Sequence, residues 1–287
     1  MKELLAPGNA SVVRSLARPG TLIVLDFDGT LAPMVADRHA AGLAPRSRAV
    51  LRRLSSSFPV AVLSGRGARD VRERLSGLGV RWVVGSHGAE WPGEGRAHRA
   101  WRTRVERWRA TLAARLSKAD GVELEVKPLS LAIHYRRSRD PRGALARIGE
   151  AAGDLPGAAV ILGKKVVNLV PVEAGDKGTA LRRLVGLAGA ELVLFVGDDV
   201  TDEAAFAARL EIPAVMVRVG RDPASRAGAW LRRRSDVDVL LERLCLLREA
   251  AEAGPPRSTF HSASGSCAAG LRQARKKAGG VTTWVNR

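Results

Sequence analysis

Residues 21–34 read TLIVLDFDGTLAPM, and the rest of the chain can be organised around this segment. Its apolar run, residues 22–25, has no alternation, which is typical of a strand buried on both faces of a parallel sheet. The run stops at Asp26 and Asp28, and Gly29 allows a tight turn after them. Carboxylates at i and i+2 leave a strand on the same side, so we expect both in one cleft beyond the sheet's C-terminal edge. Burying two like charges together is costly unless a cation neutralises them, so this arrangement favours a divalent metal ion.

The same pattern of apolar run, polar tip and helix recurs along the chain. Further buried strands are predicted at residues 58–63, 82–84, 192–196 and 214–219. Helices are predicted at residues 3–16, 47–54, 68–75, 179–187 and 237–248. Strands that alternate with helices in this way predict an α/β fold with a doubly wound parallel sheet.

Between residues 91 and 173 the pattern changes to segments that pair locally. A loop is predicted at residues 91–99, helices at 100–116 and 142–152, and strands at 122–126, 131–135, 158–162 and 165–170, the last two joined by a Gly163-Lys164 turn. This predicts an inserted α+β cap domain. The predicted domains are a helical lead-in (1–20), the core (21–90 and 174–248), the cap (91–173) and a disordered tail (249–287).

Composition excludes several classes of protein. The formal net charge is +18, but Arg is scattered, aromatic residues are only 4%, and no nucleic-acid-binding motif is present, so we expect no specific nucleic-acid function. No apolar run approaches the roughly 18 residues of a membrane span. The cysteines, Cys245 and Cys267, lack metal-ligand spacing, and the first 20 residues lack a secretory signal pattern. We therefore expect a cytoplasmic protein without membrane association.

Reactive polar residues follow several of the predicted strands and should meet at one edge of the sheet. Asp26, Asp28 and Asp198 offer the hard oxygen ligands that suit Mg²⁺. Ser64 and Lys177 offer a hydroxyl and a positive charge that suit phosphate oxygens. A single Asp-rich loop is more often a turn or a helix cap, but four such signals in order favour a phosphoryl-transfer site.

Two roles in phosphoryl transfer suit the first pair of carboxylates. Asp26 is placed to attack phosphorus and form an aspartyl-phosphate. Asp28 is placed to protonate the leaving alkoxide and then to deprotonate the attacking water.

At this point a family resemblance is evident. DFDGT, Ser64, Lys177 and the GDDVTD run resemble, in order, the four motifs of the haloacid dehalogenase (HAD) superfamily of phosphohydrolases. The trehalose-6-phosphate phosphatase family is indicated by LSGR (63–66), GSHGAE (85–90), HYR (134–136), GKKV (163–166), DKG (176–178) and GDDVTDEAAF (197–206). The resemblance covers residues 22–241 and leaves both ends outside.

The resemblance implies a role for each matching residue. Asp26 would be the nucleophile and Asp28 the acid/base, with Ser64 and Lys177 holding the phosphoryl group. Mg²⁺ would be bound by Asp26, the Asp28 backbone carbonyl and Asp198, supported by Asp199 and Asp202. The implied sugar contacts are Arg66, His87, Glu90, Lys127, His134, Arg136, Lys164 and Asn168. For Lys127 and Lys164 a solvated hairpin charge, and for His134 a satisfied cap histidine, remain alternatives.

One position departs from the family pattern. Where the family commonly carries an acidic residue and then Arg before Pro, this chain reads Asn168, Leu169, Val170 and Pro171. An amide still accepts hydrogen bonds from sugar hydroxyls but carries no charge, so sugar specificity is the property affected.

The resemblance implies a Mg²⁺-dependent phosphatase that converts trehalose 6-phosphate to trehalose and phosphate, with a trehalose-phosphate synthase as a candidate partner. The alternatives are a phosphatase of another sugar phosphate, of the sucrose phosphate or glycosyl-phosphoglycerate type, and a non-catalytic partner domain of a synthase. A complete set of Asp26, Asp28, Lys177 and Asp198 argues against the second alternative.

Overall fold

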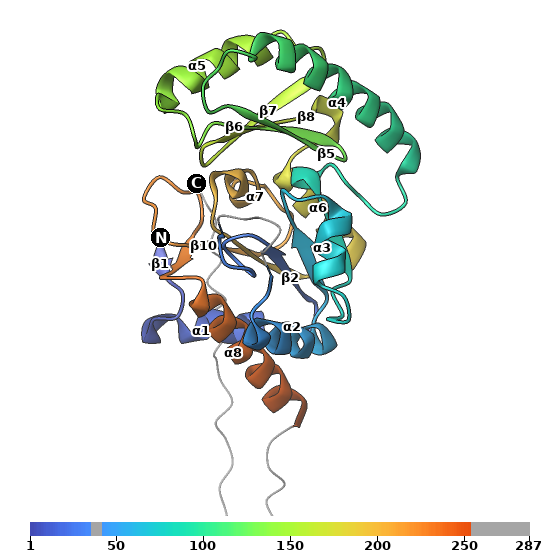
Figure 1. The fold of residues 1–287 in the computed structure, drawn as a ribbon. Coiled ribbons are helices and arrows are strands. Elements are labelled where there is room, and N and C mark those ends of the chain that lie inside the picture. Colours follow the sequence, from blue (N-terminus) through green and yellow to red (C-terminus); the bar gives the residue numbers. More distant parts are fainter. Residues whose placement is uncertain (36–41, 254–287) are drawn as a thin grey trace, which may run out of the picture.

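Parallel strands form the larger of two sheets in the computed structural model, which describes residues 1–35 and 42–253 and, for residues 95–97, only the backbone. Among these residues the sheet has seven strands in the order β1-β11-β10-β9-β2-β3-β4 (Figure 1). The strands are β1 (Lys2–Glu3), β11 (Ala229–Leu231), β10 (Ala214–Val219), β9 (Leu192–Gly197), β2 (Thr21–Asp26), β3 (Val60–Leu63) and β4 (Trp82–Val84). The predicted parallel sheet is confirmed.

Strand β2 lies near the middle of this sheet and is buried throughout, between β9 and β3. Its apolar side chains alternate between two cores. Ile23 and Leu25 pack into the cluster on one face, and Leu22 and Val24 pack into the cluster on the other. Burying such a side chain stabilises the fold by about 1.5–3 kcal/mol, which explains why the run has no polar residue.

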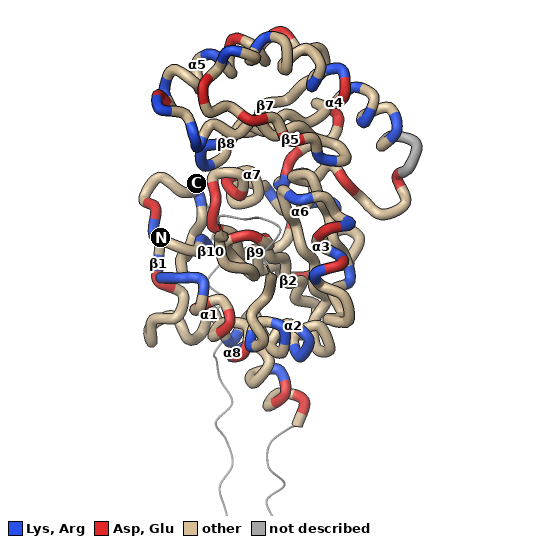
Figure 2. Tube along the Cα trace, viewed as in Figure 1, with Lys and Arg blue, Asp and Glu red and all other residues tan. Residues whose placement is uncertain are grey.

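Helices cover both faces of the sheet. One face is covered by α1 (Ala10–Leu16), α2 (Pro45–Ser57), α3 (Ala68–Arg74) and α8 (Ser235–Ala253), and the other by α6 (Lys177–Ala188) and α7 (Glu203–Phe206). Lys and Arg are spread along the outer helices and do not gather on one face (Figure 2). Among the described helices, none is both long and apolar enough to span a membrane.

The second sheet lies over the C-terminal edge of the first (Figure 1). It is antiparallel, in the order β5-β6-β8-β7, and is covered on its outer side by two helices. Its elements are α4 (Gly95–Arg115), β5 (Glu123–Lys127), β6 (Ser130–His134), α5 (Pro141–Ala152), β7 (Ala158–Gly163) and β8 (Val166–Pro171). Because the chain leaves the first sheet after β4 and returns through α6, this α+β unit, the cap, is inserted into the α/β core.

The first residues do not form the helix that was predicted from residue 3. Lys2–Glu3 is strand β1, Pro7–Asn9 is a short 3₁₀ helix, and the α-helix begins only at Ala10. The sequence analysis also missed β11, to which β1 pairs. Both strands are short, and a pairing between residues more than 200 positions apart leaves no local pattern.

Other boundaries differ by a few residues. Helix α4 begins at Gly95, inside the predicted loop 91–99, and the β7–β8 turn is Lys164-Lys165, because Gly163 still belongs to β7. Helix α8 runs to Ala253, so the prediction of a tail from residue 249 is wrong for residues 249–253. Residues 254–287 of that predicted tail lie outside the described part of the chain.

We expect Leu194→Ala to lower the free energy of unfolding by about 2–5 kcal/mol, because it opens a cavity in a core that cannot fully collapse. Leu194 is fully buried in β9, beside Ile23 of β2. Leu187→Ala is the matched control, since that side chain is 52% exposed, and a surface change stays within about 0.5 kcal/mol. Urea denaturation measures both, and equal losses would contradict the assigned core.

Candidate active site

The polar strand ends of the core meet at one edge of the sheet. Asp26 ends β2, Ser64 follows β3, and Asp198 follows β9. Because β2 is hydrogen-bonded to both β9 and β3, these three positions are neighbours beneath the cap. Lys177 is the first residue of α6, the helix that follows the cap in the sequence, and its side chain reaches the same edge of the sheet.

A buried lysine joins two carboxylates at the centre of this edge. The Lys177 ammonium donates to Asp26 Oδ1 at 2.7 Å and to Asp202 Oδ1 at 2.6 Å. All three side chains are at most 7% exposed. Burial alone would lower the pKa of Lys177, but the charges of Asp202 and Asp26 outweigh it and hold the pKa above its ordinary value. The lysine therefore stays charged.

Asp202 fixes the loop that follows β9. Its Oδ2 accepts from the backbone N–H groups of Asp198 and Asp199, both at 2.9 Å, while its Oδ1 accepts from Lys177. The Asp199 side chain in turn caps the short 3₁₀ helix η5 (Val200–Asp202). Asp202 and Asp199 therefore hold the loop in shape, and the carboxylate of Asp198 is the one left for other partners.

Three carboxylates in the described residues form a group that could hold a metal ion. Ligand oxygens of Asp26, Asp198 and Asp202 lie within 4.8 Å of one another. Burial and the neighbouring Asp202 charge raise the pKa of Asp198 to about 7. Burial also raises the pKa of Asp26 well above its ordinary range, although Lys177 opposes this. The donor set fits a hard divalent cation, which would relieve this excess of negative charge.

Gly29 lets the Asp198 carboxylate approach the backbone. Its φ is +80°, and a Cβ at this position would clash with that carboxylate. Thr30, the next residue, donates to Asp198 Oδ1 through a long bond of 3.4 Å. Only glycine satisfies both the left-handed backbone and the close approach.

Asp28 lies beyond the end of β2, and its side chain is held by Arg66 from the loop after β3. Arg66 Nε donates to Asp28 Oδ2 at 2.6 Å, and Nη2 donates to Oδ1 at 2.8 Å. Arg66 was predicted as a sugar contact, but its guanidinium is directed at this carboxylate. The same loop contains Ser64, which is fully buried and whose Oγ accepts from the Arg66 backbone N–H at 3.1 Å.

His87 lies buried in a left-handed turn between the core and the cap. Its φ is +59°, and its ring packs against Gly65, where any Cβ would overlap it. Among the described residues, neither ring nitrogen has a hydrogen-bond partner of normal geometry. Burial and the charges of Lys127 and Lys177 hold the pKa of His87 well below its usual value, against an opposing interaction with Asn168 of the cap. The imidazole is therefore neutral.

Two further predicted sugar contacts tie parts of the site together. Lys127, at the end of β5, donates to the Gly65 carbonyl at 3.0 Å, so the cap touches the loop that carries Ser64. Glu90 Oε2 accepts from the Ala68 backbone N–H at 2.8 Å and therefore caps α3.

The remaining predicted sugar contacts are a buried asparagine, a histidine paired with a glutamate, and two exposed basic residues. Asn168, on β8, is only 2% exposed and makes one long bond to a strand carbonyl. His134 Nε2 lies 2.7 Å from Glu125 Oε2 on the neighbouring strand, which agrees with the alternative of a satisfied cap histidine. Arg136 and Lys164 are exposed.

Sequence reasoning missed three polar residues of this region. Glu125 pairs with His134, and Asp70 on α3 binds Arg66. The Ser130 hydroxyl, on the strand beside Lys127, is buried without a partner among the described residues. The alternation of Glu123, Glu125 and Lys127 along β5 was the available signal for Glu125.

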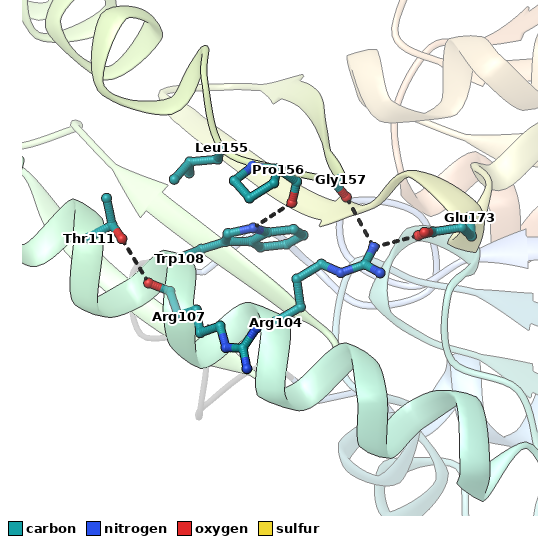
Figure 3. A pocket seen from close by; sticks show the side chains of 8 residues that line it. All are labelled: Arg104, Arg107, Trp108, Thr111, Leu155, Pro156, Gly157 and Glu173. Atoms are coloured by element: carbon teal, nitrogen blue, oxygen red, sulfur yellow. Dashed lines mark hydrogen bonds and ion pairs between the residues drawn. The ribbon is translucent and has the colours of Figure 1, made fainter.

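A hollow on the outer side of the cap is separate from this site. It has a volume of ≈ 320 Å³ and is lined by α4 and by residues near both ends of the β7–β8 hairpin (Figure 3). The Trp108 indole N–H is already bonded to the Pro156 carbonyl, and Arg104 is bonded to Glu173 and to Gly157. These bonds join α4 to the loop before β7 and, through Glu173, to the segment where the chain leaves the cap, which favours a structural role.

We expect Gly29→Ala to weaken binding of a divalent cation much more than Gly77→Ala does. Both glycines have positive φ, but a Cβ on Gly77 meets nothing within 4 Å. Each variant loses stability from backbone strain of about 1–2 kcal/mol, and only the first displaces Asp198. Titration calorimetry with Mg²⁺ measures the difference, and equal affinities would contradict the role given to Gly29.

We expect His87→Asn to reduce the loss of stability in mild acid. Since the folded pKa of His87 is lowered, the unfolded chain binds a proton that the folded chain does not, and stability falls as the pH drops below the unfolded value of 6.5. The slope from one proton is at most about 1.4 kcal/mol per pH unit. Asn tolerates the left-handed backbone. Thermal unfolding between about pH 7 and pH 5 should depend less on pH in the variant, and identical profiles would contradict this.

Comparisons with known sequences found related proteins. The family profile described as trehalose-phosphatase matches residues 24–230. A trehalose-phosphate phosphatase of Mycobacterium marinum is 37% identical over 229 residues, which cover 73% of this chain and 58% of that protein. This chain thus spans little more than half the length of that relative.

Solved structures share the fold. The C-terminal domain of Candida albicans trehalose-6-phosphate phosphatase matches with a TM-score of 0.68 at 22% identity, covering 82% of this chain and 97% of that one. The C-terminal domain of a Candida albicans trehalose synthase regulatory protein matches with a TM-score of 0.62 at 13% identity, covering 82% and 97%. The HAD-like core with its inserted cap is therefore confirmed. Because the profile spans both parts of the core and the whole cap, the chain belongs to the trehalose-phosphatase family.

Proposed function

We propose that this protein is a Mg²⁺-dependent phosphatase that hydrolyses trehalose 6-phosphate to trehalose and phosphate through an aspartyl-phosphate. One observation carries the proposal: Asp26 is buried against Lys177 and beside Asp198, at the edge of the sheet that the cap covers. A nucleophilic carboxylate, a fixed positive charge and a cation site are the parts that phosphoryl transfer to an aspartate requires.

Asp26 and Asp198 would hold the metal ion, since Asp202 already uses both oxygens within the protein. The Asp28 backbone carbonyl would complete the protein ligands, and Asp199 and Asp202 would support them. Mg²⁺ bound there would neutralise charge on the phosphoryl oxygens.

In the first half-reaction Asp26 attacks phosphorus, and the bond from phosphorus to the sugar oxygen breaks. Asp28 gives its proton to that oxygen, so that the sugar leaves as an alcohol. In the second half-reaction a water molecule gives a proton to Asp28 and attacks phosphorus, which releases phosphate and restores the Asp26 carboxylate. Lys177 and the Ser64 hydroxyl would hold the phosphoryl oxygens throughout.

The cap, residues 91–173, would bind the sugar over the core, residues 21–90 and 174–248. His87, Asn168 and Lys127 support this role best, because they lie buried or half-buried where cap and core meet. Neutral Asn168 in place of a carboxylate keeps a phosphatase of another sugar phosphate as the alternative.

A non-catalytic partner domain of a synthase is the other alternative. The match to the domain of a regulatory protein, at 13% identity, shows a shared fold and carries no information about activity. The complete cluster of Lys177, Asp26 and Asp202 supports catalysis, because a silent domain would have no reason to keep buried charges that cost stability. A cytoplasmic location and a trehalose-phosphate synthase partner belong to the same proposal.

Asp26→Asn should abolish phosphate release while leaving the fold intact, because an amide is a poor nucleophile. Asp120→Asn, at an exposed position of the cap, is the matched control and should retain full activity. Malachite-green assays measure the rates, and circular dichroism checks folding. A folded Asp26→Asn variant with activity near that of the wild type would remove Asp26 as the nucleophile.

A panel of substrates tests the sugar. We expect phosphate release to be fastest with trehalose 6-phosphate, slower with sucrose 6-phosphate, glucose 6-phosphate and a glycosyl-phosphoglycerate, and lost with a chelator. Equal rates across the panel would favour the other sugar phosphatases, and no release from any ester would favour the non-catalytic domain.

A further inference from the structure

Arg66 is held in place from several sides. Its guanidinium binds both oxygens of Asp28, and its Nη1 donates to Asp70 Oδ2 at 3.1 Å. It also lies 5.6 Å from the centre of the fully buried Phe27 ring. The Arg66 side chain is only 13% exposed, so these contacts are partly shielded from solvent.

Asp70 connects this arginine to helix α3. Its other oxygen, Oδ1, accepts from Arg74 Nε at 2.9 Å, one turn further along the helix. The backbone N–H of Arg66 is bonded to Ser64 Oγ, so the arginine is fixed at both its backbone and its side chain. A line of alternating charges thus runs from Arg74 through Asp70 and Arg66 to Asp28.

We propose that Arg66, aimed by Asp70, is a positioning residue that holds the Asp28 carboxylate ready to accept a proton from water. The proposal rests on the proposed phosphatase function, and it replaces the predicted sugar contact of Arg66. Three guanidinium nitrogens already donate to carboxylates, which is the geometry of an orienting clamp.

The clamp is compatible with proton transfer. A bidentate arginine takes one lone pair from each carboxylate oxygen and leaves the others open. When water attacks the phosphorus of aspartyl-phosphate, one water proton passes to Asp28, the bond from phosphorus to the Asp26 oxygen breaks, and phosphate leaves. The protonated Asp28 then gives this proton to the next leaving sugar oxygen. Arg66 gains and loses no proton, and it acts only through the orientation of Asp28.

A double-mutant cycle on Asp28→Asn and Arg66→Gln tests this, with p-nitrophenyl phosphate as the substrate. Nitrophenolate leaves without an acid, so the slow step is hydrolysis of the phosphoenzyme, in which Asp28 is the base. We expect Arg66→Gln to lower the steady rate about tenfold or more while the first-turnover burst changes by about twofold at most. The double variant should match Asp28→Asn alone within about twofold.

Further variants separate positioning from folding. Asp70→Asn should also lower the steady rate, but by less than Arg66→Gln does, although Asp70 would touch no substrate. Arg66→Lys should have a steady rate almost as low as that of Arg66→Gln, because an ammonium keeps the charge but cannot donate two parallel hydrogen bonds to the carboxylate. Arg69→Gln is the control, since Arg69 is 89% exposed on α3 and pairs with Glu73, one turn further along the same helix.

Two results would overturn the proposal. In the first, the rate losses of the two single variants multiply in the double variant, which would mean that Arg66 contacts the substrate or acts independently of Asp28. In the second, Arg66→Gln lowers the first-turnover burst as much as the steady rate, which would mean the same. If the wild-type protein hydrolyses no phosphate ester, the proposed function fails; if it does and the cycle is additive, only the clamp fails.

Discussion

The site depends on one buried interaction, the Lys177 ammonium held between Asp26 and Asp202. An ammonium without partners in this position would be very costly, and removing one partner of a buried pair typically costs about 3–5 kcal/mol. Asp26 ends strand β2, Asp202 lies in the short helix η5 that follows the neighbouring strand β9, and the lysine comes from the helix that follows the cap. This one cluster of charges therefore fixes both the C-terminal edge of the sheet and the start of α6, where the chain returns from the cap.

The local pattern of the sequence was sufficient to predict the centre of the core. Apolar runs without alternation marked the strands that are buried on both faces, and the polar residues that end them lie together as expected. Pairing over long distances left no such signal, so β1 and β11 were missed. The helix predicted at the start of the chain was wrong where that pairing takes over.

The candidate site could be predicted in part. Asp26 and Asp28 were expected in one cleft because alternate residues of a strand share a face. However, β2 ends at Asp26, so Asp28 lies outside the strand, and its carboxylate is bound by Arg66. Its partner Arg66 lies in the loop after β3, and no spacing in the sequence shows that the two side chains meet. The support that Asp202 gives to its own loop was equally hidden, because it depends on backbone N–H groups.

Trapping the covalent intermediate tests the proposed chemistry most directly. The protein is mixed with trehalose 6-phosphate and Mg²⁺, quenched in acid during the first turnover, digested and examined by mass spectrometry. The buried cluster around Asp26 predicts a phosphate adduct on the peptide that contains Asp26. With p-nitrophenyl phosphate, whose leaving group needs no acid, the adduct should reach a higher level in the Asp28→Asn variant, where hydrolysis is slowed. A phosphate adduct on a different residue, or rapid turnover with no adduct in either protein, would contradict it.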